Sequence, residues 1–234
     1  MNYAIIAAGE GSRLVKEGLT TPKPLVSLCG EAMIDRLIRI FLANNASSIS
    51  VIVNEEMTEV YAHLTTLRLP VPLHVVRKST PSSMHSFAAL ADTLGEGRFC
   101  LTTVDTIFSE EVFSQYIQAF QESPADGLMA VTDHIDDEKP LYVETDADLN
   151  ILSFQDATFP TAKYISGGIY CLNSKSLSVL SSCMDKGLHR MRNYQRALLT
   201  HGLKLKAYAF DKIIDVDHSG DIPKAEKILR TKFK

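Results

Sequence analysis

Apolar residues in the first half of the chain form short continuous runs, separated by segments in which apolar positions recur at helical spacing. The runs predict buried strands at Tyr3–Ala7, Ser50–Val53, Leu73–Val76 and Phe99–Val104. The helical spacing predicts helices around Ile34–Leu42, Thr58–Leu67 and Met84–Leu94. Such alternation is typical of an α/β protein with a parallel sheet and helices on both faces.

The second half of the chain shows a different pattern, in which strands follow one another more closely. Leu141–Thr145 and Ile151–Phe154 flank a polar turn and predict a hairpin. Further strands are predicted at Tyr164–Leu172, Leu205–Phe210 and Ile213–Val216, and further helices at Lys175–Met184, Tyr194–His201 and Ile222–Phe233. No internal repeat, low-complexity segment or Pro/Ser-rich linker divides the sequence, so we expect one domain.

The bulk composition argues against several functional classes. The chain has 234 residues, of which 45% are apolar and 22% charged, as is ordinary for a globular protein. Its formal net charge of −4 gives no bulk attraction to nucleic acid or to an anionic membrane. No apolar run approaches the length needed to cross a bilayer, and no signal peptide precedes the first strand. We therefore expect a cytoplasmic protein without nucleic-acid or membrane partners.

The cysteines and histidines do not indicate a metal site of their own. The four cysteines (Cys29, Cys100, Cys171 and Cys183) lie far apart and form no Cys-x-x-Cys pair. We interpret them as small buried hydrophobic residues. The seven histidines are scattered, so no His/Cys cluster has the spacing of zinc ligands.

The most informative segment is a glycine-containing loop directly after the first strand. It runs Ala7-Ala8-Gly9-Glu10-Gly11-Ser12-Arg13-Leu14 and is followed by Pro22-Lys23-Pro24. Small residues let backbone N–H groups approach a ligand closely, and Arg13 and Lys23 add the two cations that a polyphosphate needs. We predict nucleotide contacts from Ala7, Ala8, Gly9, Gly11, Ser12, Arg13 and Lys23. The loop from Gly9 to Thr20 shows no apolar anchor, so we expect it to be mobile without a nucleotide.

Two well-known phosphate-binding loops do not fit this segment. The Gly-Lys-Ser/Thr of a Walker loop is missing, and Leu14 stands where a dinucleotide fingerprint needs a third glycine. The loop Ala7–Leu14 and the Pro22-Lys23-Pro24 that follows it together resemble the signature of the nucleotidyltransferases that make nucleoside-diphosphate sugars and related metabolites, including the MobA-like group. The resemblance implies a Rossmann-like three-layer α/β/α fold with a mixed, mostly parallel sheet. It also implies one nucleotidyltransferase domain over residues 1–234, with a nucleotide-binding half at 1–131 and an acceptor-binding half at 132–234.

Two aspartates at predicted strand ends are candidate metal ligands. Asp105 follows the run Leu101–Val104, and Asp217 closes the segment Asp215-Val216-Asp217. Either aspartate could simply cap a helix or form a turn. Ligands of open α/β sheets sit beyond the carboxyl ends of the strands. The resemblance implies that Asp105 and Asp217 bind Mg²⁺ there, with triphosphate oxygens completing its octahedral shell. Whether Asp215 contributes stays open.

Two further segments resemble substrate-binding parts of the family. Ser82 and Ser83 stand where relatives have a glycine-containing turn that contacts the nucleobase, although either serine could be a plain helix N-cap. The missing glycine leaves the identity of the base open. Gly167 and Gly168 lie in a strand that resembles the one lining the acceptor pocket, and such glycines often mark the close approach of a ligand. Phe154-Gln155-Asp156 stands in place of the Glu-Lys-Pro of sugar-specific members and lacks the lysine.

The implied reaction is the transfer of a nucleoside monophosphate from an NTP to a small phosphorylated acceptor, preferably a sugar 1-phosphate, with release of pyrophosphate. Arg13 and Lys23 would be catalytic, since they stabilise phosphate charge while the acceptor oxygen attacks the α-phosphorus. One alternative is a cytidylyltransferase for an alcohol or choline phosphate, and another is a cofactor guanylyltransferase. A glycosyltransferase would share the fold without needing the Arg13/Lys23 pair. A catalytically silent nucleotide-sensing domain is a further alternative. A sensor would not need to keep Arg13, Lys23, Asp105 and Asp217 together, so their joint presence favours an enzyme. The oligomeric state is not predicted.

Overall fold

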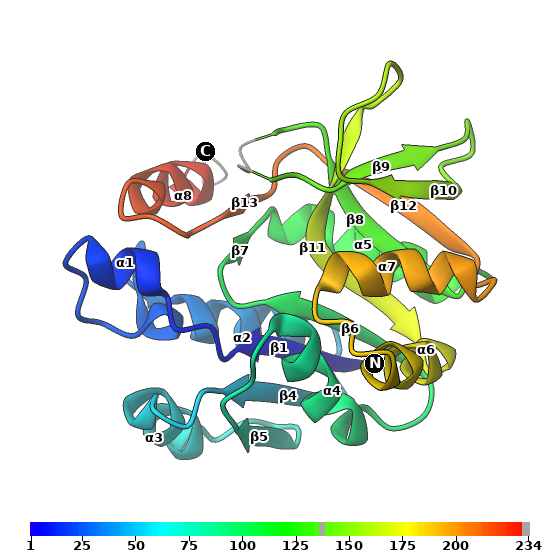
Figure 1. Ribbon diagram of the computed structural model, residues 1–234. Helices are drawn as coiled ribbons and strands as arrows, with labels where there is room; N and C mark the ends of the chain where they lie inside the picture. The colour runs from blue at the N-terminus through cyan, green and yellow to red at the C-terminus, as the bar shows by residue number, and fades with distance from the viewer. Residues whose placement is uncertain (136–138, 231–234) are drawn as a thin grey trace.

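One mixed sheet runs through both halves of the chain (Figure 1), in a computed structural model that describes residues 1–135 and 139–230. Within these ranges the sheet has nine strands: β1 (Asn2–Ala7), β4 (Ser48–Val53), β5 (Leu73–Arg77), β6 (Arg98–Thr103), β8 (Gly127–Thr132), β9 (Tyr142–Thr145), β10 (Ile151–Gln155), β11 (Tyr164–Asn173) and β12 (Leu205–Phe210). Their order is β10-β9-β11-β6-β1-β4-β5, with β8 paired to β11 and β12 paired to β8.

Strand direction changes at β11. The pairs β6–β1, β1–β4 and β4–β5 are parallel, whereas β11 runs antiparallel to β6, β8 and β9. The carboxyl ends of β1, β4 and β6 therefore meet at one edge of the sheet, which is where open α/β sheets bind ligands.

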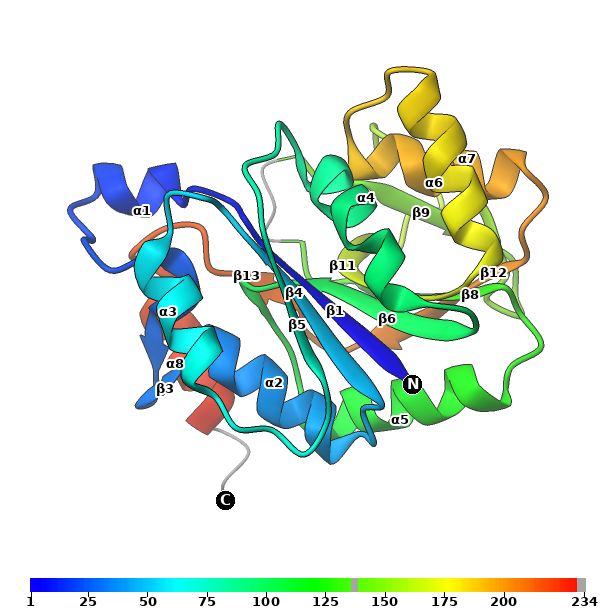
Figure 2. The ribbon, with the colours of Figure 1, turned by 90° about the horizontal axis from the view of Figure 1, so that it is seen from below.

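Seven helices in the described part of the chain cover the two faces of this sheet (Figure 2). Those that pack on one face are α2 (Met33–Ala43), α3 (Thr58–Thr66), α5 (Glu110–Glu122) and α8 (Asp221–Arg230). Those that pack on the other are α4 (Ser83–Leu94), α6 (Lys175–Asp185) and α7 (Met191–Thr200). This arrangement confirms the predicted α/β class and its three layers.

The central strand β1 shows why an apolar run becomes a strand here. Successive side chains of a strand point to opposite faces. Tyr3, Ile5 and Ala7 accordingly pack into the core under α2 and α5, while Ala4 and Ile6 pack into the core under α4. Because both faces are covered, the buried residues from Tyr3 to Ala7 are all hydrophobic and no polar alternation remains.

Two short antiparallel ladders add to the main sheet. Strand β2 (Ser27–Leu28) pairs with β3 (Glu31–Ala32), and β7 (Thr106–Ile107) pairs with β13 (Ile214–Asp215). The second ladder brings the segment after β6 against the segment before α8. The predicted strand at Ile213–Val216 therefore exists, but it pairs outside the nine-stranded sheet.

Helix α5 and strand β8 were not among the predicted elements. The helix has a clear start, since the Ser109 side chain accepts a hydrogen bond from the Val112 N–H and two glutamates occupy the first turn. Its buried residues recur at helical spacing: Phe113, Tyr116, Ile117 and Phe120. Strand β8 is wholly buried, as expected for an apolar run of this length.

Three other expectations differ from the structure in part. The loop after β1 contains a short helix, α1 (Ser12–Lys16), whose Leu14 is only 2% exposed, so the expected lack of an apolar anchor is wrong. Cys29 is exposed while the other three cysteines are buried, so the interpretation as a buried residue is wrong for Cys29. Helix α8 ends at Arg230, and residues 231–233 of the predicted helix lie outside the described residues. No helix among the described residues is long and apolar enough to span a bilayer.

Asp126 holds together the starts and ends of three neighbouring strands. It precedes β8, and its carboxylate accepts hydrogen bonds from the Asn173 side chain, the Lys204 N–H and the Lys175 ammonium. The Lys204 N–H and the ion pair with Lys175 hold the pKa of Asp126 at about 2, below its ordinary value. A carboxylate with a depressed pKa stabilises the fold only while it is ionised.

We expect Asp126→Asn to reduce the free energy of unfolding by about 1–3 kcal/mol at pH 7, because a single amide oxygen cannot accept from all three donors. The unfolded-state pKa of an aspartate is about 3.9. The deficit should therefore be complete above pH 4 and shrink as the pH falls toward 2, since protonation removes the same interaction from the unsubstituted protein. Urea denaturation at pH 7, 4 and 3 measures this. The exposed Asp185 supplies the control, and an Asp126→Asn deficit no larger than that of Asp185→Asn would contradict the assignment.

Candidate active site

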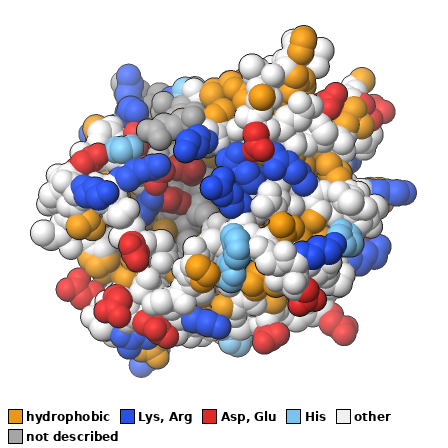
Figure 3. All heavy atoms as spheres, viewed as in Figure 1, with side chains coloured by type: hydrophobic (Ala, Val, Ile, Leu, Met, Phe, Trp, Pro, Cys, Tyr) orange, Lys and Arg blue, Asp and Glu red, His pale blue; other side chains and the backbone are white. Residues whose placement is uncertain are grey.

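A cavity of about 560 Å³ opens at the carboxyl ends of β1, β4 and β6. Its lining comes from the loop after β1, the segment before α4 and the ends of the strands: Ile6, Ala8, Gly9, Glu10, Gly11, Ser12, Arg13, Lys23, Asn54, Thr80, Pro81, Ser82, Ser83, Ser86, Thr103, Val104, Asp105 and Asp217. Figure 3 shows this face hollowed near its centre, with acidic side chains inside the hollow and Lys and Arg side chains along its rim. The cavity is large enough for a small ligand.

Lys23 is the buried cation of this cavity. It begins a single 3₁₀ turn, Lys23–Leu25, that follows Pro22, and only 8% of its side chain is exposed. Its Nζ lies 2.5 Å from Asp105 Oδ2 and 2.7 Å from Asp217 Oδ1. Burial alone lowers the pKa of Lys23, but the two carboxylates outweigh that effect and leave the pKa above its ordinary value. Lys23 is therefore a fixed positive charge.

The two aspartates meet because of the ladder between β7 and β13. Asp215 pairs with Thr106, and the Val216 N–H donates to the Asp105 carbonyl at 3.1 Å. This backbone pairing places Asp217 beside Asp105, although the two residues are far apart in the sequence. The structure thus brings Lys23, Asp105 and Asp217 to one point, at the edge of the sheet that the sequence indicated.

Helix α1 is tied across the cavity to the segment that follows Asp217. Arg13 Nη1 lies 2.8 Å from Asp217 Oδ2, so Asp217 joins both predicted cations. Glu17 accepts from the Ser219 N–H and contacts the His218 ring, in each case at 2.6 Å. The His218 contact, followed by the Ser219 contact, lowers the pKa of Glu17, and Glu17 in turn raises the pKa of His218. The sequence analysis missed this contact between Glu17 and His218.

Gly9 and Gly11, two of the three glycines in the loop after β1, differ in how much a side chain at their position would disturb the structure. Gly11 has a φ of 62°, and a Cβ built on it would lie 3.1 Å from Lys23 Cβ. A side chain there would both strain the backbone and push against Lys23. A Cβ on Gly9 would meet no atom within 4 Å, so the protein itself leaves that space open beside the cavity.

Ser82 and Ser83 both line the cavity, and Ser82 is also the N-cap of α4. Its hydroxyl accepts from the His85 N–H and contacts His85 Nδ1 at 2.8 Å. The interpretation of Ser82 as a helix N-cap is therefore compatible with its interpretation as a nucleotide contact. The polar residues Asn54, Thr80, Ser86 and Thr103 also line the cavity and were missed. Asn54 directly follows β4, so the strand-end argument used for Asp105 would have found it.

A second cavity of about 340 Å³ adjoins the first and shares Arg13 and Asp217 with it. Gly167 lines this cavity, and a Cβ there would lie 2.3 Å from Ile213 Cδ1. Gly168 is not among the described lining residues. Its φ of 74° lies within the irregular pairing between β11 and β8. The glycine pair is thus explained at least partly by the packing of the chain itself.

Asp215 belongs to the short strand β13 and lines the second cavity with its side chain exposed. The protein around this carboxyl group replaces part of its water, and the negative charges of Asp105 and Asp217 lie nearby, so the pKa of Asp215 is raised above its ordinary value. Asp221, Lys224 and two histidines, His134 and His218, complete the charged and titratable lining. The second cavity therefore presents carboxylates together with basic groups.

The donor set suits a magnesium ion that is also held by phosphate. The described residues contain no group of three or more His, Cys, Asp or Glu side chains that could hold a metal by themselves. Asp105 and Asp217 bring two carboxylates to one point at the edge of the cavity, where both contact the Lys23 ammonium. Mg²⁺ is usually bound by one or two carboxylates plus phosphate and water oxygens.

The mostly parallel sheet, with its cavity at the carboxyl ends of β1, β4 and β6, has the arrangement of Rossmann-like proteins, which bind nucleotides at this edge. The family model of the MobA-like NTP transferase domain matches residues 3–200. Because the match covers most of the chain, the protein belongs to the MobA-like NTP transferase domain family.

Solved structures and a curated relative agree with this assignment. The inositol-1-phosphate CTP transferase of T. maritima superimposes with a TM-score of 0.81 at 17% identity, covering 100% of this chain and 97% of that one. A Bacillus anthracis protein described as a glucose-1-phosphate thymidylyltransferase gives 0.84 at 19% identity, covering 98% and 95%. At such identities the likeness shows the fold alone. The 2-aminoethylphosphonate cytidylyltransferase of Lancefieldella rimae is 31% identical over 112 residues, which span 47% of this chain and 45% of that relative. The match thus spans less than half of either protein.

We expect Gly11→Ala to lower the free energy of unfolding by about 1–2 kcal/mol, because a left-handed backbone is strained for any residue with a Cβ. Gly9→Ala is the matched control, since Gly9 has no positive φ and an open space around the added methyl group. Urea denaturation of the two variants measures the difference. Equal stabilities would contradict the conclusion that the backbone at Gly11 requires a glycine.

Proposed function

We propose that the protein transfers a nucleoside monophosphate from an NTP to a small phosphate or phosphonate acceptor and releases pyrophosphate. The observation that carries the proposal is the contact of Lys23 with both Asp105 and Asp217, beside a cavity lined by the backbone of Gly9–Gly11. A buried ammonium and an adjacent guanidinium, Arg13, supply fixed positive charge where a triphosphate would lie. Asp105 and Asp217 would hold Mg²⁺, which neutralises phosphate charge when bound.

The residues of this chain would act by position and charge. The acceptor oxygen attacks the α-phosphorus in line and pyrophosphate leaves, so no covalent enzyme intermediate is needed. Lys23 is held by the 3₁₀ turn after Pro22, and it would contact the α-phosphate region. Arg13 would hold the departing β,γ-phosphates from α1. On nucleotide binding both cations exchange carboxylate partners for phosphate oxygens, which favours ordering of α1 over the nucleotide.

We further propose that the nucleotide is CTP and the acceptor a small amino-alcohol phosphate or aminoalkylphosphonate, in preference to a sugar 1-phosphate. The relative from Lancefieldella rimae supports this choice, since it is a 2-aminoethylphosphonate cytidylyltransferase. The chain also lacks the lysine of sugar-specific members, and Asp156 at that place pairs with Arg192 and Arg196. Asp215 lines the second cavity, and its carboxylate would pair with the cationic amine of such an acceptor.

Pyrophosphate release tests the proposal directly. The purified chain is incubated with Mg²⁺, each of the four NTPs, and 2-aminoethylphosphonate, phosphocholine or a hexose 1-phosphate. Release with CTP and the amine-bearing acceptors supports the full proposal. Release only with a hexose 1-phosphate would retain nucleotidyl transfer and overturn the acceptor class. No release with any combination, together with nucleotide binding, would favour a silent nucleotide sensor.

Within that assay we expect Lys23→Ala to reduce kcat/KM by about 10²–10³, the scale for deleting one preorganised charged donor. Lys16→Ala is the matched control, because Lys16 is an exposed lysine on α1, away from the cavity lining. Circular dichroism of both variants checks the fold. Unchanged kinetics of Lys23→Ala at saturating Mg²⁺ would exclude Lys23 from phosphate contact.

A further inference from the structure

In the second cavity, the arginine and the lysine of the described lining each contact an aspartate of the same lining. Arg13 Nη1 lies 2.8 Å from Asp217 Oδ2. Lys224 Nζ lies 3.0 Å from Asp221 Oδ1. These positive charges are therefore offset by neighbouring carboxylates. Asp215 is the third aspartate of this lining.

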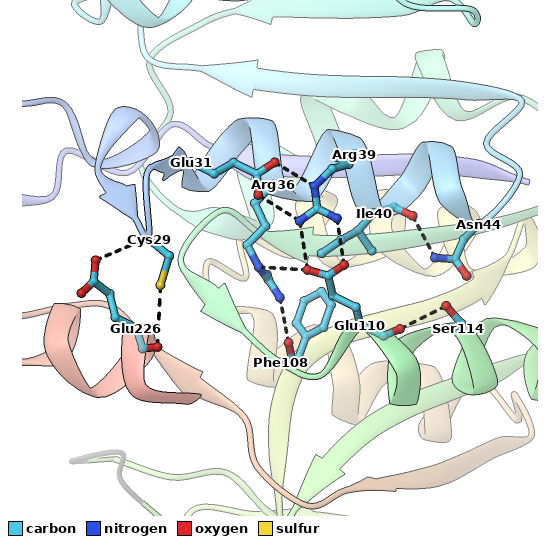
Figure 4. A network of polar contacts seen from close by, with 10 residues as sticks. All are labelled: Cys29, Glu31, Arg36, Arg39, Ile40, Asn44, Phe108, Glu110, Ser114 and Glu226. Atoms are coloured by element: carbon cyan, nitrogen blue, oxygen red, sulfur yellow. Dashed lines mark hydrogen bonds and ion pairs between the residues drawn. The ribbon is translucent and has the colours of Figure 1, made fainter. Parts of the chain in front are cut away.

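Asp215 differs from the other two aspartates, because it forms no ion pair with any residue that the structure describes, and its side chain is exposed in the cavity. Carboxylates near the surface of this protein are paired elsewhere, as Figure 4 shows for Glu31 and Glu110, which both contact Arg39. The carboxylate of Asp215 is thus available to a cation that enters the cavity. Such a cation favours the ionised form of the carboxyl group.

Ser166 adds a hydrogen-bond acceptor to the same lining. Its Oγ donates to Gln195 Oε1 at 2.9 Å, and Gln195 is only 3% exposed. A serine hydroxyl has a single proton, so Ser166 Oγ can then only accept a hydrogen bond from a ligand. An ionised carboxylate also only accepts. Asp215 and Ser166 together therefore suit a positively charged group that carries N–H donors.

The second cavity also lacks the side chains that recognise a cation without N–H donors. Its described lining contains no phenylalanine, tyrosine or tryptophan, and the sequence has no tryptophan at all. Proteins typically hold a quaternary ammonium against aromatic faces. A primary ammonium instead carries three N–H donors, which oxygen acceptors satisfy. The lining is of the kind that suits a primary ammonium.

Asp215 lies within short reach of the place where the two cavities meet. It precedes Asp217 by two residues, so their Cα atoms are at most about 7 Å apart. Asp217 and Arg13 line both cavities. An acceptor whose phosphorus lies beside Asp217 therefore reaches Asp215 with an ammonium through a short alkyl spacer.

We propose that the acceptor carries a primary ammonium on a short spacer, and that Asp215 and Ser166 select it against a quaternary ammonium; this inference rests on the proposed function. Asp215 pairs with the positive charge, and Ser166 Oγ accepts one of the N–H groups. Trimethylation removes every N–H donor and enlarges the group. A quaternary analogue therefore leaves Ser166 Oγ without a partner and holds its charge farther from Asp215.

A series of acceptors that differ only in N-methylation tests this selection on the full chain: phosphoethanolamine, its N-methyl and N,N-dimethyl forms, and phosphocholine. Initial rates of pyrophosphate release are measured with CTP and Mg²⁺. We expect kcat/KM to fall along the series and to be about 10–100-fold lower for phosphocholine than for phosphoethanolamine, the scale of one hydrogen bond to a charged group. 2-Aminoethylphosphonate and its trimethylated analogue give the same comparison for phosphonates.

Ser166→Ala removes the acceptor without changing any charge. It should lower kcat/KM for phosphoethanolamine, leave that for phosphocholine nearly unchanged, and so narrow the ratio between them. Ser181→Ala is the matched control, because Ser181 is an exposed serine on α6 that donates to the Leu177 carbonyl oxygen. Asp215→Asn should lower kcat/KM for both acceptors, since both are cations.

Equal kcat/KM along the series, or a preference for phosphocholine, would overturn this inference and leave nucleotidyl transfer to an amine-bearing acceptor intact. Release with a hexose 1-phosphate but with no member of the series would overturn the proposed acceptor class, and the inference with it. An unchanged ratio in Ser166→Ala would remove Ser166 from the selection. The series on the unsubstituted chain decides the matter if a variant fails to fold.

Discussion

The burial of the Lys23 ammonium determines where three separate segments of the chain must meet. Removing an ammonium from water is costly unless carboxylates surround it, and here these come from Asp105 and Asp217. The loop after β1, the end of β6 and the segment before α8 must therefore meet at one point. Pro22 precedes the turn that begins with Lys23, and Gly11 leaves room for the Lys23 side chain. The β7–β13 ladder brings the two aspartates next to each other.

Much of this arrangement could be predicted because the determinants are local. The apolar run of β1 and the helical spacing of α2 depend on burial and periodicity alone. The small residues from Ala7 to Ser12 and the aspartates at strand ends follow from the chemistry of phosphate and from the geometry of parallel sheets. Helix α5 carries similar local signals, namely the N-cap Ser109 and buried aromatic residues at helical spacing, so it is also predictable from the sequence.

Other features depend on contacts between distant segments, which a single sequence does not display. The contact of Glu17 with His218 joins two surface positions with no pattern in common. The exposure of Cys29 follows from where the β2–β3 hairpin sits against α8. Gly167 resembles a ligand contact in the sequence, yet Ile213 occupies the space where its side chain would be.

The pairing of β6 with β11 has a mechanical consequence. Residues 98–102, in the predicted nucleotide-binding half, are paired in register with residues 169–173, in the predicted acceptor-binding half. A hinge between the two halves would have to break this central ladder, so the two cavities keep a fixed separation set by strand spacing. Under the proposed function, a longer or shorter acceptor would have to be accommodated by replacing side chains along the cavity walls, because the backbone of the sheet stays fixed.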